Sequence, residues 1–396
     1  MLTTLAINNY RSIRELVIPL TRLNLIIGTN GSGKSNLYRA LRLLAGTAQD
    51  GIVAPLALEG GLKSVVWAGP DDHSGRMRRG EIPVQPRARG TPPRLRLGFS
   101  GEDFGYAVSM GLVSHDSGED RETPSSFALD PEFKRESIWA GPFLRRANLL
   151  IDREGSVVRR KSDDGWDVLT QSLPRYESLF SQVGKDRLNP EVFAVREAMR
   201  SWRFYDHFRI DTDAPARRSQ IGTRTLVLHH DGRDLAAAWQ TIREIGDREA
   251  LDEAVFDAFP GARVEIHAQP GGLFSLLFHQ EGLLRPLTAA ELSDGTLRYL
   301  LLTTALLTAR PPDLMVLNEP EASLHPDLTP ALGRLIRRAA RNSQVWVISH
   351  STRLASALEE DPDCNTLVLD KVFSETTIVG QGMLDRPAWH WADASK

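Results

Sequence analysis

The sequence has little of several features that would assign it to common classes of protein. Only one of its 396 residues is cysteine, Cys364, which excludes a disulfide framework and a cysteine-rich metal site. The formal net charge is only −3 at pH 7, so the whole chain lacks the basic excess that is typical of nucleic-acid-binding proteins. Any contact with nucleic acid would therefore have to come from a local patch.

Targeting and membrane-spanning segments are also missing. Met1–Thr4 has no basic stretch and no long apolar run follows it, so we expect no signal peptide. The most apolar window, Leu297–Leu307, is interrupted by Arg298 and two threonines and is too short to span a bilayer. We find no internal repeat and no sustained heptad pattern. These absences predict a cytoplasmic protein without membrane contact.

One short segment is specific. Residues 28–35 read Gly-Thr-Asn-Gly-Ser-Gly-Lys-Ser, the full G-x-x-x-x-G-K-[ST] pattern of a phosphate-binding loop, and they lie between an apolar strand and a helical run. The glycines allow backbone N–H groups to surround phosphates, and the helix N-terminus adds a positive dipole end. No Asn-Lys-x-Asp guanine motif is present, which favours ATP over GTP. The predicted nucleotide-binding residues are Gly28, Asn30, Gly31, Ser32, Gly33, Lys34, Ser35 and Asn36.

The pattern of apolar residues divides the chain into four segments. Residues 1–50 read as strands and a helix, and residues 190–290 as a helical and β lobe. Residues 291–396 alternate helices and strands, as in a parallel sheet covered by helices. In residues 51–189, short apolar runs between Gly, Pro, Asp and Arg clusters predict an antiparallel β insert with long loops. The runs interpreted as strands include Ser64–Trp67, Leu95–Phe99 and Asn148–Ile151.

Polar residues follow two apolar strands in the last segment. Leu314–Leu317 leads into Asn318-Glu319-Pro320-Glu321, and Val345–Ile348 leads into Ser349-His350. Strands of a parallel sheet carry ligand-binding residues at their carboxyl ends. The pattern therefore predicts the second half of a nucleotide site.

These pieces together resemble the ABC-type ATPase heads of the RecF/SMC/OLD-like branch, here without a coiled coil or a Toprim domain. The resemblance implies an α/β fold: a P-loop ATPase head with a mixed central sheet, an antiparallel β insert and a helical signature lobe. It covers the first fifty residues and about residues 290–370. The matching motifs are Ile7–Ile13 (opening strand), Leu292–Thr296 (LSGGQ signature), Asn318–Glu321 (Walker B), Ser323–Pro326 (D-loop) and His350 (switch histidine).

The resemblance implies a role for each matching residue. Lys34 would bind the β- and γ-phosphates, Glu319 would act as general base, and His350 would contact the γ-phosphate or the attacking water. Two heads would sandwich ATP as a homodimer. The other implied residues are Ser293, Asp294 and Gly295 across the dimer, Ser35, Asn318 and Gln182 at Mg²⁺, and Arg11 at the nucleotide phosphates. By the residues alone, the signature segment also reads as a plain helix N-cap and Arg11 as a surface charge.

Two departures from the family pattern bear on activity. In the signature, Asp294 replaces a glycine and Thr296 replaces a glutamine. Asn318 stands where the family usually has aspartate, and it keeps an oxygen ligand but loses a negative charge. Losing one charge-assisted interaction costs about 1–3 kcal/mol. Because Glu319 is intact, we expect ATP binding and slow ATP hydrolysis.

The sequence leaves the biological target open. An arginine-rich stretch suggests a DNA-backbone contact, although a solvated loop explains it equally well; its candidates are Arg76, Arg78, Arg79, Arg87 and Arg89. The first hypothesis is an ATPase that acts on DNA in repair or anti-phage defence. The alternative is a nucleotide-gated switch that controls a separate effector protein, such as a nuclease. No nuclease domain is expected in the residues after Asp370, and the opening motif disfavours a transporter ATPase.

Overall fold

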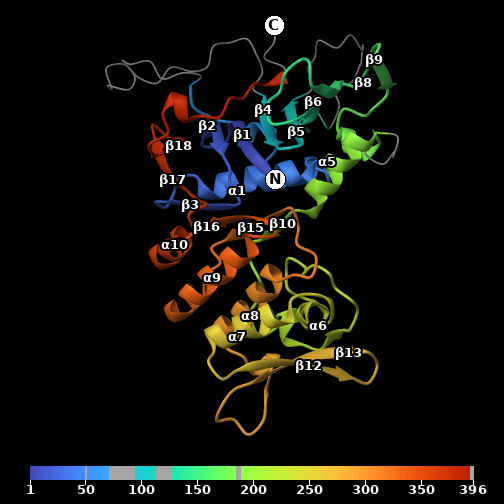
Figure 1. Cartoon of the computed structure of the whole chain (residues 1–396). Coiled ribbons are helices and arrows are strands. Elements are labelled where there is room, and N and C mark those ends of the chain that lie inside the picture. The colour runs from blue at the N-terminus through green and yellow to red at the C-terminus, as the bar shows by residue number, and fades with distance from the viewer. Residues whose placement is uncertain (50, 71–93, 113–126, 128, 184–188, 393–396) are drawn as a thin grey trace. The chain divides into compact units, whose positions relative to one another are not determined.

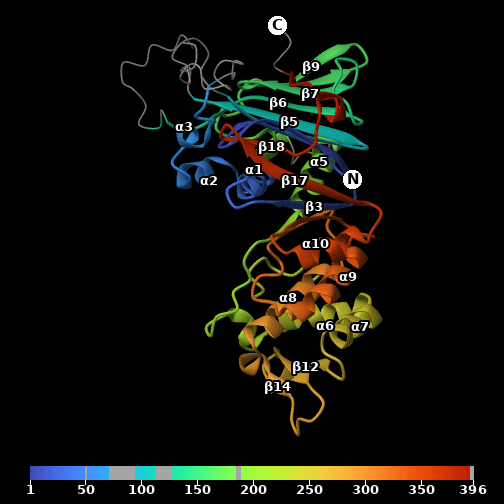
Figure 2. The same ribbon diagram turned by 90° about the vertical axis from the view of Figure 1, so that its left-hand side faces the viewer.

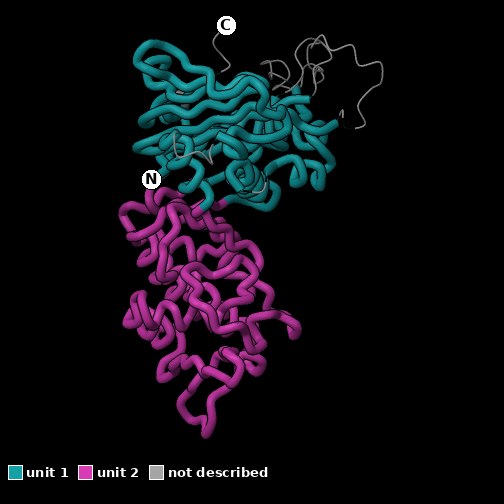
Figure 3. The backbone as a smooth tube through the Cα atoms, turned by 90° about the vertical axis from the view of Figure 1, so that its right-hand side faces the viewer, with its two compact units in different colours: residues 1–20, 28–200, 368–396 teal, residues 21–27, 201–367 magenta. Residues whose placement is uncertain are grey.

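The computed structural model describes residues 1–49, 51–70, 94–112, 127, 129–183 and 189–392. The chain divides into two compact units that interleave along the sequence (Figure 3). Unit 1 comprises residues 1–20, 28–200 and 368–396, and unit 2 comprises residues 21–27 and 201–367. The boundaries of the four segments drawn from the sequence stay a prediction.

Unit 1 contains an eight-stranded antiparallel sheet in the order β2-β1-β4-β5-β6-β7-β8-β9 (Figures 1 and 2). The predicted antiparallel insert is confirmed, and it continues the sheet of the two N-terminal strands. The strands are β1 (Leu2–Tyr10), β2 (Ile13–Pro19), β4 (Leu95–Gly101), β5 (Phe104–Gly111), β6 (Glu132–Ala140), β7 (Leu149–Glu154), β8 (Val157–Ser162) and β9 (Gly165–Thr170). Helix α1 (Lys34–Gly46) packs against β1 and β4 through its apolar face.

The expected strand at Ser64–Trp67 is wrong. Ser64 and Val65 instead belong to the short helix α3 (Leu62–Val65), which follows another short helix, α2 (Val53–Leu58). Gly60 and Gly61 have φ values of 92° and 79°, and this glycine turn starts α3. Leu62 and Val65 then lie three residues apart on one helix face, and both are buried. Tertiary burial therefore outweighs the β preference of two adjacent valines.

Unit 1 also contains a helix near residue 190 and a hairpin near the end of the chain. The expected helix after Pro190 is confirmed as α5 (Pro190–Ser201). Strand β17 (Cys364–Val372), of which residues 368–372 belong to this unit, pairs with β18 (Glu375–Ile378) in an antiparallel hairpin whose register joins Leu369 to Ile378. Phe373 and Ser374 form the hairpin turn with φ values of 49° and 67°.

Unit 2 is built on a parallel sheet in the order β10-β15-β16-β3. Its strands are β10 (Arg203–Tyr205), β15 (Leu314–Asn318), β16 (Gln344–Ile348) and β3 (Leu23–Gly28), of which residues 23–27 belong to this unit. The central strands are almost wholly apolar and buried, as expected for a parallel sheet covered on both faces. Parallel pairing places the carboxyl ends of β15, β16 and β3 at one edge of the sheet.

Helices and a second sheet complete unit 2, and most lie where the sequence predicts them. The helices are α6 (Leu235–Ile245), α7 (Arg248–Ala258), α8 (Asp294–Leu306), α9 (Thr329–Ala339) and α10 (Thr352–Glu359). The antiparallel strands are β11 (Gln220–Ile221), β12 (Arg263–Gln269), β13 (Leu273–His279) and β14 (Leu287–Thr288). Figure 1 shows α8 and α9 between the parallel sheet and the layer of α6 and α7, with β12 and β13 beyond.

The most apolar stretch of the sequence is the core helix of unit 2. Every residue of α8 from Leu297 to Leu306 is buried. Arg298 is among them, and its charge is held by backbone carbonyls described below. Within the described ranges, none of the helices has the length and apolar character that crossing a membrane requires.

Candidate functional site

The predicted phosphate-binding loop runs from Gly28, the last residue of β3, to Lys34, the first residue of α1. Its glycines 28, 31 and 33 have φ values of 152°, 82° and 112°, which side-chain-bearing residues rarely adopt. Lys34 is buried, and its ammonium donates hydrogen bonds to the carbonyls of Gly28 at 2.5 Å and Thr29 at 3.0 Å. The loop therefore holds a cation within a glycine-rich turn, as a phosphate site requires.

A network of hydrogen bonds in unit 1, formed mainly by hydroxyl groups, holds this loop in place. Thr376, on β18, donates through its hydroxyl to the carbonyl of Ser32 at 2.9 Å. The Thr376 and Ser12 hydroxyl oxygens are 2.7 Å apart, and Asn36 donates through its side-chain amide to Ser12 at 2.8 Å. The network joins the opening motif, the loop and the hairpin near the chain end. Sequence reasoning missed Thr376, because no local pattern marks a contact 344 residues away.

The residues of the loop fit a nucleotide phosphate. The Ser32 hydroxyl oxygen is buried and has no hydrogen-bond partner among the described residues. The buried Lys34 ammonium donates to two carbonyls of its own loop, and phosphate oxygens can take the place of those acceptors. Ser35 and Asn30 are exposed, so both are accessible to a ligand.

Replacing Gly33 with alanine is expected to abolish measurable ATP binding and to destabilise the protein by about 1–3 kcal/mol. A Cβ atom at this position would lie 2.1 Å from the Thr376 hydroxyl oxygen, on a backbone with φ of 112°. Thermal unfolding and nucleotide titration check both effects. Gly31→Ala is the matched control, because it has φ of 82° but open space around the new atom. Equal effects of the two changes would refute the steric argument.

Two further residues predicted for the site, Arg11 and Gln182, lie in unit 1. The Arg11 guanidinium donates to the Glu59 carboxylate at 2.7 Å, and the Tyr10 hydroxyl donates to the same oxygen at 3.0 Å. Burial raises the pKa of Tyr10, and the charge of Glu59 adds to that shift. Gln182 is exposed at the end of a short turn, Leu179–Ser181. The phosphate contact of Arg11 and the metal contact of Gln182 stay predictions.

The acidic half of the predicted site lies in unit 2. Glu319 directly follows β15 and has a left-handed backbone, with φ of 49°. Its N–H donates to the carbonyl of Ile348 at 2.8 Å, which fixes this conformation against the end of β16. The His350 imidazole Nε2 lies 3.1 Å from a Glu319 carboxylate oxygen. Both side chains remain partly exposed, at 48 % for Glu319 and 39 % for His350, so water and substrate can reach them.

Glu321 holds the backbone on which His350 is placed. One of its carboxylate oxygens accepts hydrogen bonds from the Ser349 hydroxyl at 2.6 Å, the His350 N–H at 3.0 Å and the Ser351 N–H at 3.1 Å. The carboxylate therefore also serves the N-terminus of α10, where Ser351 is the cap. Glu321 is part of the sequence motif, but the motif alone does not indicate this structural role.

Arg298 connects helix α8 to the acidic motif. Its guanidinium is buried and donates to the carbonyls of Glu319 at 2.9 Å and Pro320 at 3.4 Å. Burial lowers the pKa of this guanidinium, and the carboxylates of Glu321, Glu319 and Asp206 oppose that shift. A buried cation bonded to the carbonyl of Glu319 helps to hold the strained backbone there. Its position inside an apolar run concealed this role from sequence analysis.

Asn318, the residue that departs from the family pattern, has an acidic partner on the next strand. Its side-chain amide donates to a carboxylate oxygen of Asp206 at 2.7 Å. Asp206 directly follows β10, which pairs with β15 in parallel. Sequence analysis did not single out Asp206, because the strand before it has only three residues and no motif.

The predicted signature residues form the start of α8. Ser293 caps the helix, and its hydroxyl oxygen accepts from the Thr296 N–H at 3.2 Å. Asp294 is exposed and accepts from Arg217 at 2.6 Å. A Cβ atom on Gly295 would lie 3.0 Å from the carbonyl of Ser323, so glycine permits the close approach of the D-loop. The N-cap interpretation and a ligand-binding role are compatible here, because Ser293 and Asp294 remain exposed.

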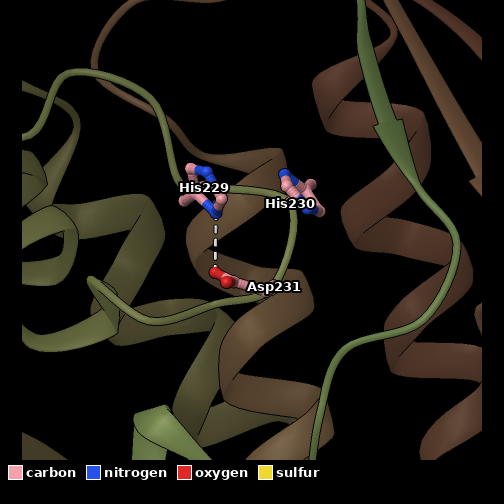
Figure 4. A group of neighbouring side chains, drawn as sticks. All are labelled: His229, His230 and Asp231. Atoms are coloured by element: carbon pink, nitrogen blue, oxygen red, sulfur yellow. Dashed lines mark hydrogen bonds and ion pairs between the residues drawn. The ribbon is translucent and has the colours of Figure 1, made fainter. Parts of the chain in front are cut away.

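Three residues before α6 bring metal-ligating atoms together (Figure 4). One ligand atom from each of His229, His230 and Asp231 lies within 4.8 Å of the others. His229 Nδ1 and an Asp231 carboxylate oxygen are already hydrogen-bonded at 2.6 Å. The His229 N–H also donates to Asp234, the N-cap residue of α6, at 2.9 Å. These hydrogen bonds explain why the three side chains lie together: they stabilise the turn that precedes α6.

The predicted DNA-binding arginines lie outside the described residues, namely Arg76, Arg78, Arg79, Arg87 and Arg89. Two further basic groups belong to the described part of unit 1. Arg145 and Arg146 are exposed in the loop before β7, and Arg159, Arg160 and Lys161 lie on β8. The Lys161 ammonium donates to the carbonyl of Ala147, which joins the two groups.

Comparisons with known proteins identify the family of the chain and its fold. A family model described as "AAA domain, putative AbiEii toxin, Type IV TA system" matches residues 23–356. No curated protein matches the chain in sequence. A crystal structure of an Smc head bound to the C-winged helix domain of ScpA has a TM-score of 0.52 at 14 % identity, covering 97 % of this chain and 98 % of that one. The SMC head domain from Thermotoga maritima has a TM-score of 0.46 at 13 % identity, covering 96 % and 99 %.

The Smc head comparison shows the fold, and the family model extends over most of the chain. The expected fold class and the expected kind of protein, an ABC/SMC-like P-loop ATPase head, are both confirmed. The family assignment also supports nucleotide binding in general terms. The chain belongs to the AAA-domain ATPase family whose model it matches, and it has the fold of an SMC head.

Proposed function

We propose that the protein is an Mg²⁺-dependent ATPase in which the loop at residues 28–35 holds ATP and Glu319 activates water. One observation carries the catalytic part of this proposal. Glu319 is held in a left-handed backbone conformation, with His350 against its carboxylate at 3.1 Å. Strained backbone at a motif position is a common property of catalytic residues. The family model and the complete loop motif support the nucleotide-binding part.

In the proposed reaction, Glu319 takes a proton from a water molecule. The water oxygen forms a bond to the γ-phosphorus, and the bond from that phosphorus to the bridging oxygen breaks. ADP leaves with the electron pair, inorganic phosphate is released, and the proton later passes to solvent. His350 orients the Glu319 carboxylate and donates to the γ-phosphate or the water. Lys34 balances the negative charge that moves toward the β-phosphate.

Ser35, Asn318 and Gln182 are the proposed residues around Mg²⁺. The ion, when bound, would neutralise phosphate charge during transfer. Hydroxyl and amide oxygens suit this hard cation, although a carboxylate suits it better. The chemistry of these donors therefore fits Mg²⁺ bound mainly through the nucleotide.

We also propose that ATP brings two copies together as a homodimer. The start of α8, formed by the exposed Ser293 and Asp294 and the half-buried Gly295, would contact the γ-phosphate of ATP held by the second copy. The N-terminus of α8 offers backbone N–H groups and a positive dipole end to that phosphate. Glu319→Gln, which would retain ATP, is the form in which the dimer should accumulate. Molecular mass measured with and without ATP tests this step, and a monomer at saturating ATP would contradict it.

DNA is the proposed target, in repair or in defence against phage. The basic groups on β8 and in the loop before β7 support a contact with the phosphate backbone. Binding of double-stranded DNA should then weaken steeply as salt rises. ATP hydrolysis should increase when DNA is present. If no DNA binding is found even at low salt, the DNA part of the proposal fails.

The family description favours a second candidate function. That description names a toxin of a toxin–antitoxin system, which suits an ATPase that controls or is controlled by a separate protein. In this case ATP binding gates an interaction with an effector such as a nuclease, and DNA is irrelevant. ATP-dependent capture of a defined partner by Glu319→Gln, without any DNA stimulation of turnover, would support this candidate over the first.

A further inference from the structure

The parallel strands β10 and β15 bring one acid and one amide to the same edge of the sheet in unit 2. Their register pairs Phe204 with Val316 and Tyr205 with Leu317. Asp206 directly follows β10, and Asn318 is the last residue of β15. The side chains of these two residues are hydrogen-bonded at 2.7 Å. The acid is therefore displaced by one strand from the position where the family usually has it.

The hydrogen bond fixes which way the Asn318 amide points. An ionised carboxylate accepts hydrogen bonds but cannot donate them. The Asn318 amide therefore presents its N–H₂ group to Asp206. The amide oxygen of Asn318 is then not used in the contact with Asp206. Asn318 in this orientation keeps an oxygen ligand at the carboxyl end of β15.

The pair also retains the negative charge of the usual arrangement. An aspartate at position 318 would place two like charges within hydrogen-bond distance, where they repel each other. An Asn318–Asp206 pair instead carries a single charge and an internal hydrogen bond. Burial lowers the pKa of the Arg298 guanidinium on α8, and the carboxylate of Asp206 opposes that shift together with those of Glu321 and Glu319. The electrostatics of the acidic motif therefore include Asp206.

We propose that Asp206 is a positioning residue for Mg²⁺, acting through Asn318 and supplying the negative charge that Asn318 lacks. This inference rests on the proposed ATPase function. In this proposal, Asn318 supplies the oxygen ligand and Asp206 supplies the negative charge, and together they replace the usual aspartate. The site then keeps its metal affinity despite the departure in the motif.

The test measures the Mg²⁺ concentration that half-saturates binding of a fluorescent ATP analogue. Asp206→Asn keeps the shape and an acceptor for Asn318 but removes the charge. We expect the half-saturating Mg²⁺ concentration to rise about ten- to a hundredfold, while affinity for the analogue without Mg²⁺ stays within about twofold. The matched control is Asp213→Asn, which also removes one carboxylate from unit 2 but at an exposed site that pairs with Arg218.

The decisive variant exchanges the two side chains. Asp206→Asn combined with Asn318→Asp restores one charge and one hydrogen bond, in the arrangement usual for the family. We expect it to return the half-saturating Mg²⁺ concentration to within about threefold of the unmodified protein. An unchanged Mg²⁺ dependence in Asp206→Asn overturns the inference. Loss of Mg²⁺-free binding in Asp206→Asn, or no recovery on exchange, shows a merely structural role and also overturns it.

The same experiment separates this inference from the proposed function. If the unmodified protein binds no nucleotide, or if Lys34→Ala binds it equally well, the proposed function fails. If the unmodified protein binds the analogue through Lys34 but the Asp206 variants behave as the Asp213 control does, only the inference about Asp206 fails.

Discussion

Replacing Lys34 with alanine is expected to weaken ATP binding by at least about a hundredfold. The ammonium is buried and donates to two carbonyls of its own loop, and phosphate oxygens can take the place of those acceptors. Each charge-assisted hydrogen bond contributes about 1.5–3 kcal/mol, and two such bonds exceed the ~2.7 kcal/mol of a hundredfold change. Equilibrium titration with a fluorescent ATP analogue measures the loss.

Lys34→Arg separates charge from shape in this prediction. It keeps the positive charge, but its planar guanidinium does not fit among the carbonyls that now surround a compact ammonium. We therefore expect Lys34→Arg to lose most of the affinity although the positive charge is kept. Lys34→Ala with full affinity would show that the nucleotide is held elsewhere.

Replacing Glu319 with glutamine is expected to slow ATP hydrolysis by about 10²–10⁴-fold while ATP still binds. Glutamine is nearly isosteric and can occupy the same left-handed backbone, but it cannot accept the proton of the attacking water. Any change in the contact between residue 319 and His350 is a smaller effect, because both side chains are partly exposed. Single-turnover measurements with chemical quench give the rate, and retention of ATP is measured in parallel.

Asp327→Asn is the control for removing one carboxylate near this motif. Asp327 is 82 % exposed and lies at the start of the turn before α9. It should leave the single-turnover rate within about twofold. A Glu319→Gln protein that hydrolyses ATP as quickly as the Asp327→Asn protein would exclude Glu319 as the base.

Local patterns predicted the fold well where they were strong. The loop glycines, the strand before them and the amphipathic run after them are adjacent in the sequence, so one motif predicts the strand, the turn and the helix. The apolar strands β15 and β16 ended in polar residues, which predicted Glu319 and His350 at the same sheet edge. The run at Ser64–Trp67 was misassigned because burial of Leu62 and Val65 favours a helical turn over valine's local preference.

The remaining contacts depend on pairing across the chain. Thr376 reaches Ser32 only because a hairpin near the chain end folds back on the loop. Asp206 meets Asn318 only because β10 pairs with β15, and this pairing joins residues 112 positions apart. In the sequence, Arg298 only interrupts an apolar run. Its role is seen in the structure, where its guanidinium donates to the carbonyl of Glu319. Single-sequence patterns carry no information on such partners, and the structure was needed to find them.

The most direct test of the whole account is steady-state release of phosphate from ATP, with and without Mg²⁺, by three proteins purified side by side. The account predicts Mg²⁺-dependent release by the unmodified protein, and none above background by Lys34→Ala or Glu319→Gln. Release at the same rate by all three proteins would contradict it, because neither the loop nor the acidic motif would then carry the reaction.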